Sequence, residues 1–171
     1  LQWTGRAFNT FLLTLAAPWS TGPLYGLLPL ATVLLSLGAL YFCVHSLVPE
    51  LSTRDKATCA LLLCAASLSA LPALNETLYW LSGMPYTWAT ALSLLALALA
   101  GRAFRENGRR LNFWSCALLL LLNGTLLEPV SVMQIVLTFL AALYFLSLGA
   151  TAKAKRAVVL LLVALLAFLA M

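Results

Sequence analysis

Glu76 is the residue with the clearest potential for chemistry, because it stands alone in a long uncharged interval of the sequence. The flanking segments 57–74 and 87–101 contain no charged residue. Tyr79 and Trp80 follow Glu76 by three and four residues, a spacing that would place them on the same helical face. Aromatic planes beside a carboxylate suit a sugar, whose C–H faces stack while its hydroxyls hydrogen-bond to the acid. An acid within the aromatic belt of any membrane interface would give the same pattern, so both interpretations stay open.

Three further residues are candidates for substrate binding. The guanidinium of Arg6 is well shaped to bind a phosphate, although an arginine that extends from an interfacial helix to water would look the same. Tyr86 closes the aromatic segment 75–86. Glu128 precedes Pro129 at an expected helix start, where the positive end of the helix dipole would by itself account for an acid.

The sequence contains no recognisable metal-ligand motif, so the cofactor is unknown and a divalent metal is neither indicated nor excluded. No two cysteines form a Cys-x-x-Cys pair, and the apolar surroundings favour small buried side chains over disulfides or metal ligands. These cysteines are Cys43, Cys59, Cys64 and Cys116. The lone histidine, His45, falls near the end of an apolar segment, where a hydrogen-bonded or interfacial side chain is expected.

The composition is that of an integral membrane protein. Hydrophobic residues make up 63% of the chain and charged residues 9%, against about 45–50% and 25% in soluble domains. Several apolar runs are long enough to cross the ~30 Å hydrocarbon layer as helices of about 20 residues. The run 91–100 is rich in alanine and leucine, which form helices readily, and lacks the alternation of a membrane barrel strand. The sequence therefore predicts an all-α, polytopic transmembrane helix bundle.

We expect a single transmembrane domain over residues 1–171, and part of a longer chain, because the sequence begins with leucine and ends within an apolar run. Segment 1–18 is expected to form an amphipathic helix along the interface, closed by Pro18. Thr53 and Asn123 are candidates for capping helix ends. About six whole or partial spans are predicted, over residues 30–48, 57–74, 87–102, 111–127, 129–149 and 157–171.

The basic residues predict the orientation of this bundle. Nine of the ten fall in connections on one side of the predicted membrane. The positive-inside rule places these connections in the cytoplasm and segment 75–86 outside. In such a chain the net charge of +5 reflects the basic residues that set the orientation in the membrane. The expected partner is therefore the lipid bilayer rather than nucleic acid. The nine are Arg54, Lys56, Arg102, Arg105, Arg109, Arg110, Lys153, Lys155 and Arg156.

Three motifs resemble those of bacterial multi-spanning membrane proteins in the GT-C glycosyltransferase-like group, which includes glucosyltransferase-like and uncharacterised families. The motifs are Trp3-Thr-Gly-Arg6 before an amphipathic helix, Asn75-Glu76-x-x-Tyr79-Trp80-x-x-Gly83-x-x-Tyr86, and Asn123-x-x-x-x-Glu128-Pro129. The resemblance implies sugar transfer from a polyprenyl-phosphate-linked donor at the outer face of the bacterial inner (plasma) membrane.

The resemblance also implies roles for particular residues. An inverting transfer needs a carboxylate to take the acceptor proton and a cation to hold the leaving phosphate, and Glu76 and Arg6 are the candidates. Enzymes of this group usually carry an acidic motif in the first outer loop, which has no counterpart in this sequence. The catalytic base is therefore either Glu76 or a residue upstream of Leu1. The expected substrate contacts are Arg6, Tyr79, Trp80, Tyr86 and Glu128.

Two functions of other classes remain open. A non-catalytic membrane subunit or scaffold would use the aromatic segment to dock other membrane subunits, with Arg6, Glu76 and Glu128 at separate rim positions. A transporter would line a polar path with Glu76 and Glu128, and it would favour charges deeper in the spans, where the sequence has none. The enzyme predicts instead that Arg6, Glu76 and Glu128 share one cavity.

Overall fold

The computed structural model of the 171-residue chain describes Thr14 and residues 27–70, 84–105 and 108–170. Within these ranges every regular element is an α-helix, which confirms the all-α class. The expected interfacial helix over residues 1–18 lies outside the described residues. The helices are α2 (Leu27–Leu47), α3 (Thr53–Ser69), α5 (Met84–Ala103), α6 (Arg110–Gly124), α7 (Glu128–Ser147) and α8 (Thr151–Leu169).

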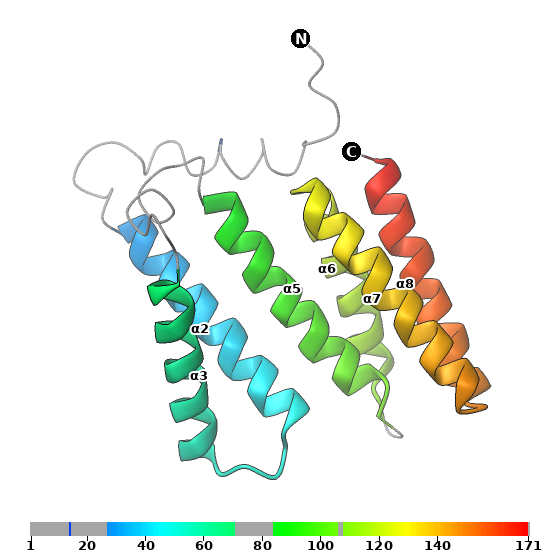
Figure 1. Ribbon diagram of the computed structural model, residues 1–171, viewed down its shortest axis with the longest axis horizontal. Helices are drawn as coiled ribbons and strands as arrows, with labels where there is room; N and C mark the ends of the chain where they lie inside the picture. The colour runs from blue at the N-terminus through cyan, green and yellow to red at the C-terminus, as the bar shows by residue number, and fades with distance from the viewer. Residues whose placement is uncertain (1–13, 15–26, 71–83, 106–107, 171) are drawn as a thin grey trace.

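These helices lie side by side and alternate in direction, so the connections fall at two opposite ends of the bundle (Figure 1). The α2–α3, α5–α6 and α7–α8 connections lie at one end, which we call the basic end because the nine basic residues named above lie in or beside them. At the opposite end α2, α5 and α7 begin and α3, α6 and α8 end. Helix α2 packs against α5 as well as against α3, and α8 packs against both α6 and α7.

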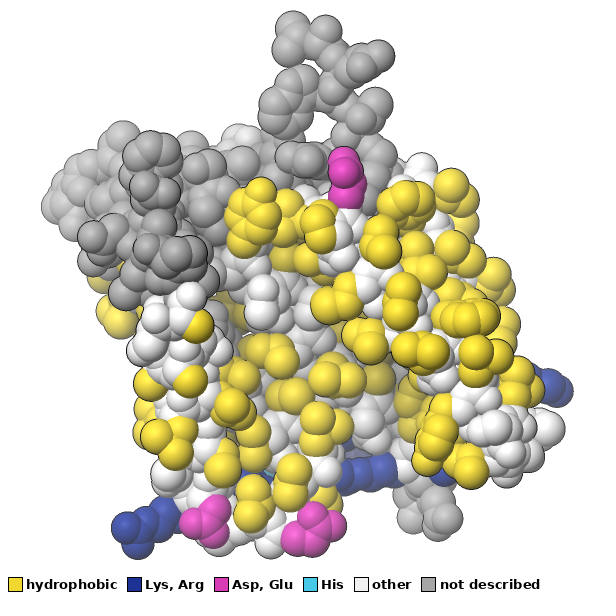
Figure 2. Space-filling model, viewed as in Figure 1, with side chains coloured by type: hydrophobic (Ala, Val, Ile, Leu, Met, Phe, Trp, Pro, Cys, Tyr) yellow, Lys and Arg dark blue, Asp and Glu magenta, His cyan; other side chains and the backbone are white. Residues whose placement is uncertain are grey.

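Two helices, α2 and α7, are long and apolar enough to cross a membrane. Only 22% of the apolar window in α2 and 17% of that in α7 is buried, whereas the core helix of a soluble domain would be mostly covered. Large apolar side chains cover the face of the bundle shown in Figure 2. Such an extensive apolar surface is unusual on a soluble monomer.

The predicted arrangement of about six spans needs more membrane-crossing helices than these two. With 17 and 15 residues, α3 and α6 are shorter than the roughly 20 residues of a perpendicular span. Helix α8 carries Lys153, Lys155 and Arg156 in its first two turns. The expectation of about six spans therefore stays a prediction.

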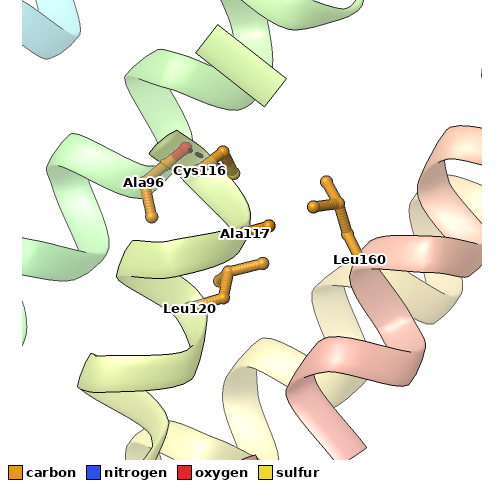
Figure 3. Packing of buried hydrophobic residues seen from close by; sticks show 5 residues of the cluster. All are labelled: Ala96, Cys116, Ala117, Leu120 and Leu160. Carbon is orange, nitrogen blue, oxygen red and sulfur yellow. Dashed lines mark hydrogen bonds between the residues drawn. The ribbon is translucent and has the colours of Figure 1, made fainter. Parts of the chain in front are cut away.

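Small side chains hold the second half of the bundle together. The buried face of α8 is made of Ala154, Ala157, Leu160, Ala164 and Ala167, which recur every three or four residues. Leu160 extends from α8 toward α6, and it forms one hydrophobic cluster with side chains of α5 and α6 (Figure 3). Small residues at such contacts let helix backbones approach closely. The clustered side chains are Ala96, Cys116, Ala117, Leu120 and Leu160.

All six described helices begin before the predicted spans, α8 by the most. Ser52, rather than Thr53, caps α3, because its hydroxyl accepts a hydrogen bond from the backbone N–H of Asp55 at 3.2 Å. The prediction of Thr53 as the cap is therefore wrong by one residue. Helix α8 begins at Thr151, six residues before the predicted span, because alanine, lysine and arginine all favour helix.

Replacing Ser52 with alanine is expected to lower the free energy of unfolding by about 1 kcal/mol, the usual cost of losing an N-cap side chain. Thermal unfolding of the purified protein, followed by circular dichroism, measures this loss. Thr53→Ala is the matched control and should be nearly neutral, since Thr53 is already helical and exposed. A larger loss for Thr53→Ala than for Ser52→Ala would contradict this assignment.

Candidate functional site

The structure describes two of the six predicted site residues, Tyr86 and Glu128. Tyr86 lies in the first turn of α5 and Glu128 is the first residue of α7, and both are exposed. Both helices begin at the end opposite the basic end (Figure 1). The other four, Arg6, Glu76, Tyr79 and Trp80, lie outside the described residues.

A groove of about 180 Å³ between α2, α3 and α5 begins at Tyr86, and we call it the Tyr86 groove. It continues along α5 to Leu94, roughly 12 Å farther toward the middle of the bundle at the helical rise of 1.5 Å per residue. Most of its hydroxyl groups, those of Ser67, Tyr86, Thr87 and Thr90, line the outer part, whereas the deeper part is mainly apolar and includes Ser36. The lining residues are Ser36, Leu40, Cys64, Ser67, Leu68, Tyr86, Thr87, Thr90, Ala91 and Leu94.

The hydroxyls of this groove are arranged to accept hydrogen bonds. Ser67 donates its proton to the backbone carbonyl of Leu63 at 2.7 Å, and Thr90 donates to the carbonyl of Tyr86 at 2.8 Å. Each hydroxyl has one proton and two lone pairs, so these oxygens can still accept. The groove therefore suits a ligand with hydroxyl donors at one end and an apolar chain at the other.

The predicted acid is linked to this groove through the order of the chain. Helices α3 and α5 both border the groove, and residues 71–83, which join them in the sequence, contain Glu76, Tyr79 and Trp80. The placement of these three residues lies outside the described part of the chain. Their juxtaposition with Tyr86 stays a prediction.

The position of Glu128 supports its structural explanation. The N-cap residue of α7, Leu127, makes no side-chain cap bond, and Glu128 supplies a negative charge in the first turn beside Pro129. A carboxylate there interacts favourably with the helix dipole. A role for Glu128 in substrate binding stays a prediction.

Asn123 does not cap a helix, so the prediction of a capping role is wrong. It is fully buried in α6, and its Nδ2 donates to the hydroxyl of Ser93 on α5 at 2.8 Å. A similar bond joins α5 to α2, where the indole Nε1 of Trp88 donates to the hydroxyl of Thr32 at 3.1 Å. Polar side chains thus link neighbouring helices inside the bundle. The sequence contained each residue but could not identify its partner.

Several basic residues have structural partners that sequence reasoning missed. Arg105 donates to the backbone carbonyl of Ser46, Lys56 to that of Pro49 at 2.9 Å, and Arg156 to that of Ala103 at 3.0 Å. These carbonyls lie at or just after the ends of α2 and α5, where backbone acceptors lack helical partners. Lys56 and Arg156 lie in the first two turns of α3 and α8, so their positions in the sequence do not indicate these partners.

The cysteine prediction is confirmed for Cys43, Cys64 and Cys116, which are buried free thiols, whereas Cys59 is partly exposed. His45 is exposed near the end of α2 and stacks on Tyr41. No cluster of histidine, cysteine or acidic residues that could hold a metal ion occurs within the described ranges.

Comparison of the chain with protein-family models finds no match, and comparisons with curated proteins and with solved structures find none either. The resemblance to the GT-C group therefore rests on the motifs quoted from the sequence.

Proposed function

We propose that this chain is a polytopic protein of the bacterial plasma membrane that transfers a sugar from a polyprenyl-phosphate carrier at the outer face. The observation that carries the proposal is the uneven distribution of basic residues between the two ends of the bundle. All described lysine and arginine residues gather at the basic end, and the Tyr86 groove begins at the opposite end. By the positive-inside rule the basic end faces the cytoplasm and the Tyr86 groove faces outward.

The exposed surface supports the membrane part of this proposal. The apolar side chains that cover the helices between the two ends (Figure 2) would contact lipid. The connections at both ends would contact water and lipid head groups. In this arrangement each described helix spans or partly spans the bilayer, with the shorter α3 and α6 accommodated by local thinning.

The Tyr86 groove supports the choice of substrate. A prenyl chain would lie against Leu40 and Leu94 in the deeper part. The sugar hydroxyls would donate to the oxygens of Ser67 and Thr90 at the outer part. The phosphate needs a cation, a role we assign to Arg6 from the sequence. Glu76 would take the proton from the acceptor hydroxyl.

The orientation can be tested with single cysteines placed at the two ends of the bundle. In a background with Cys43, Cys59, Cys64 and Cys116 replaced by serine or alanine, Glu128→Cys should react with a membrane-impermeant maleimide in intact cells. Thr151→Cys at the basic end should react only after permeabilisation, because the reagent cannot reach the cytoplasm. Labelling of Thr151→Cys alone in intact cells would contradict the proposed topology.

The substrate site can be tested by filling the groove. Thr90 lines the groove and is exposed, so Thr90→Trp should obstruct the donor without disturbing the core. We expect transfer from a polyprenyl-phosphate sugar to fall about tenfold, the equivalent of roughly 1.4 kcal/mol. Leu140→Trp, on an exposed face of α7 outside the groove, is the matched control and should be nearly silent. Equal activity of both variants would contradict a donor site in the groove and would favour a scaffold.

A further inference from the structure

The connections at the basic end differ in their balance of charge. The α2–α3 connection with the first turn of α3, residues 48–56, contains two basic and two acidic residues, so its charges balance. Segments 102–110 and 151–156 contain the other seven basic residues and a single acid, Glu106. The excess positive charge of the basic end therefore lies around the α5–α6 connection and the start of α8 (Figure 1).

These two charged segments meet at the backbone carbonyl of Ala103, at the end of α5. Nη1 of Arg156, in the second turn of α8, donates to this carbonyl at 3.0 Å, although 53 positions separate the two residues. Gly108 of the α5–α6 connection lies against the same carbonyl, so closely that a Cβ at Gly108 would clash with it. The start of α8 and the residues that follow Gly108 are therefore neighbours.

Helices α6 and α8 both begin at the basic end and run in the same direction, which places further cations side by side. The two helices are in contact at Leu160 in the middle of α8, and again where Gly124 lies against Ala167 near their far ends. Arg110 is 14 residues before Gly124 and Lys153 is 14 residues before Ala167, so the two basic residues lie level at the same helical rise. We call Arg109, Arg110, Lys153 and Lys155 the α6–α8 basic cluster.

No described group offsets the charges of the α6–α8 basic cluster. Its four side chains form no hydrogen bond or ion pair with a described residue, whereas Arg105 and Arg156 donate to backbone carbonyls. The first turns of α6 and α8 contain no acid, and the positive ends of helix dipoles disfavour cations there. Glu106 lies outside the described residues, and one carboxylate offsets only one of these charges. The fold therefore gathers positive charge that an anion would stabilise.

Exposed apolar side chains follow directly from the cluster along α6. Leu111 comes after Arg110 and is 72% exposed, and Trp114, about one turn farther along the helix, is 62% exposed. Tryptophan is enriched where a membrane meets water, with its ring at the level of the lipid head groups. A ligand that fits both the cluster and this surface has a negatively charged head and an apolar tail.

We propose that the α6–α8 basic cluster binds the head group of an anionic phospholipid in the cytoplasmic leaflet, with an acyl chain along Leu111 and Trp114. The head group must carry a net negative charge, because a zwitterionic one would bring a further cation to the cluster. Free phosphate and nucleic acid fit less well, since neither would use the apolar surface beside the cluster. The proposal rests on the membrane orientation proposed above and is independent of sugar transfer.

Lipid selectivity can be measured on the whole protein by native mass spectrometry in a mild detergent. Phosphatidylglycerol and phosphatidylcholine with the same acyl chains are added in equal amounts, and we expect adducts of phosphatidylglycerol to exceed those of phosphatidylcholine about tenfold. Equal binding of the two lipids, or displacement of phosphatidylglycerol by millimolar inorganic phosphate, would overturn the proposal. Lipids reach both ends of the protein in a micelle, so the result does not depend on the orientation, which the cysteine labelling tests separately.

Charge variants separate a site from general attraction to the basic end. Arg110→Gln should reduce the preference for phosphatidylglycerol about fivefold, the effect of one basic residue at an anionic surface, and adding Lys153→Gln should abolish it. Arg54→Gln is the matched control, because it removes the same charge from an exposed position in the balanced segment 48–56, and it should leave the preference unchanged. Equal losses in Arg54→Gln and Arg110→Gln would overturn the proposal.

The stability of the same variant shows whether Arg110 has a partner within the protein. In phosphatidylcholine nanodiscs Arg110→Gln should unfold at the same temperature as the unmodified protein or a higher one, because it removes repulsion between like charges. A lower unfolding temperature there would show that Arg110 is already paired within the protein and would overturn the proposal.

Discussion

Replacing Glu76 with glutamine in the full-length protein is expected to lower sugar transfer about a hundredfold or more while leaving folding nearly intact. The proposed role of Glu76 is to take the proton of the acceptor hydroxyl. The neutral amide of glutamine cannot act as this base. Losing a charge-assisted contact made in the transition state costs ~3 kcal/mol or more, which corresponds to a factor of about a hundred. Initial rates with a polyprenyl-phosphate sugar donor, normalised to the amount of protein in the membrane, measure the effect.

Two comparison variants make this result specific. Glu128→Gln removes an acid at the start of α7, and it should change transfer only a few-fold because the helix-dipole contribution is ~1 kcal/mol or less at an exposed site. Arg6→Ala should mainly raise the KM for the donor, since Arg6 is assigned to the phosphate. Full activity of Glu76→Gln at normal expression would identify Glu76 as an acid of the aromatic belt and would remove the main reason for the enzyme assignment.

Replacing Gly124 with alanine is expected to lower the free energy of unfolding by about 1–3 kcal/mol, the usual cost of overpacking a core. A Cβ at Gly124 would lie 2.6 Å from the Cβ of Ala167 and 3.2 Å from Oε1 of Gln134. Both Cβ atoms are fixed by their helix backbones, so α6 and α8 would have to separate. Thermal unfolding in detergent, or unfolding by a denaturing detergent, measures the loss.

Matched glycine and alanine variants test this close approach. Gly38→Ala changes a helical glycine with open space around it, and it should stabilise α2 by about 0.5–1 kcal/mol. Ala167→Gly combined with Gly124→Ala should recover part of the lost stability, because it removes the opposing Cβ. Equal losses for Gly38→Ala and Gly124→Ala would show that the α6–α8 contact does not determine the outcome.

The sequence predicted where most helices lie, because a long apolar run of helix formers can pair its backbone N–H and C=O groups in the absence of water by forming a helix. Helix α2 was expected over residues 30–48 and occupies Leu27–Leu47, and α7 was expected over 129–149 and occupies Glu128–Ser147. The start of α8 was missed by six residues. An apolar run marks the part of a helix suited to lipid, whereas the helix itself begins wherever the backbone can first be satisfied, here at Thr151.

The contacts between helices could not be read from the sequence. Asn123 and Ser93 are 30 positions apart, and nothing local distinguishes a buried asparagine with a partner from one at a helix end. The Tyr86 groove likewise depends on the relative placement of three helices. Of the predicted site residues, Tyr86 lines a groove and Glu128 begins a helix. The proposed role of Glu76 rests on the sequence.

The bond between Asn123 and Ser93 has a consequence for producing the protein in a eukaryotic host. Asn123, Gly124 and Thr125 form an Asn-x-Thr glycosylation acceptor. The amide nitrogen that would carry the glycan is buried and donates to Ser93, so attachment is possible only before α6 packs against α5. A glycan on Asn123 would therefore mark misfolded chains. Thr125 is the residue to change when the acceptor must be removed, because its hydroxyl bonds within its own turn, to the carbonyl of Leu122.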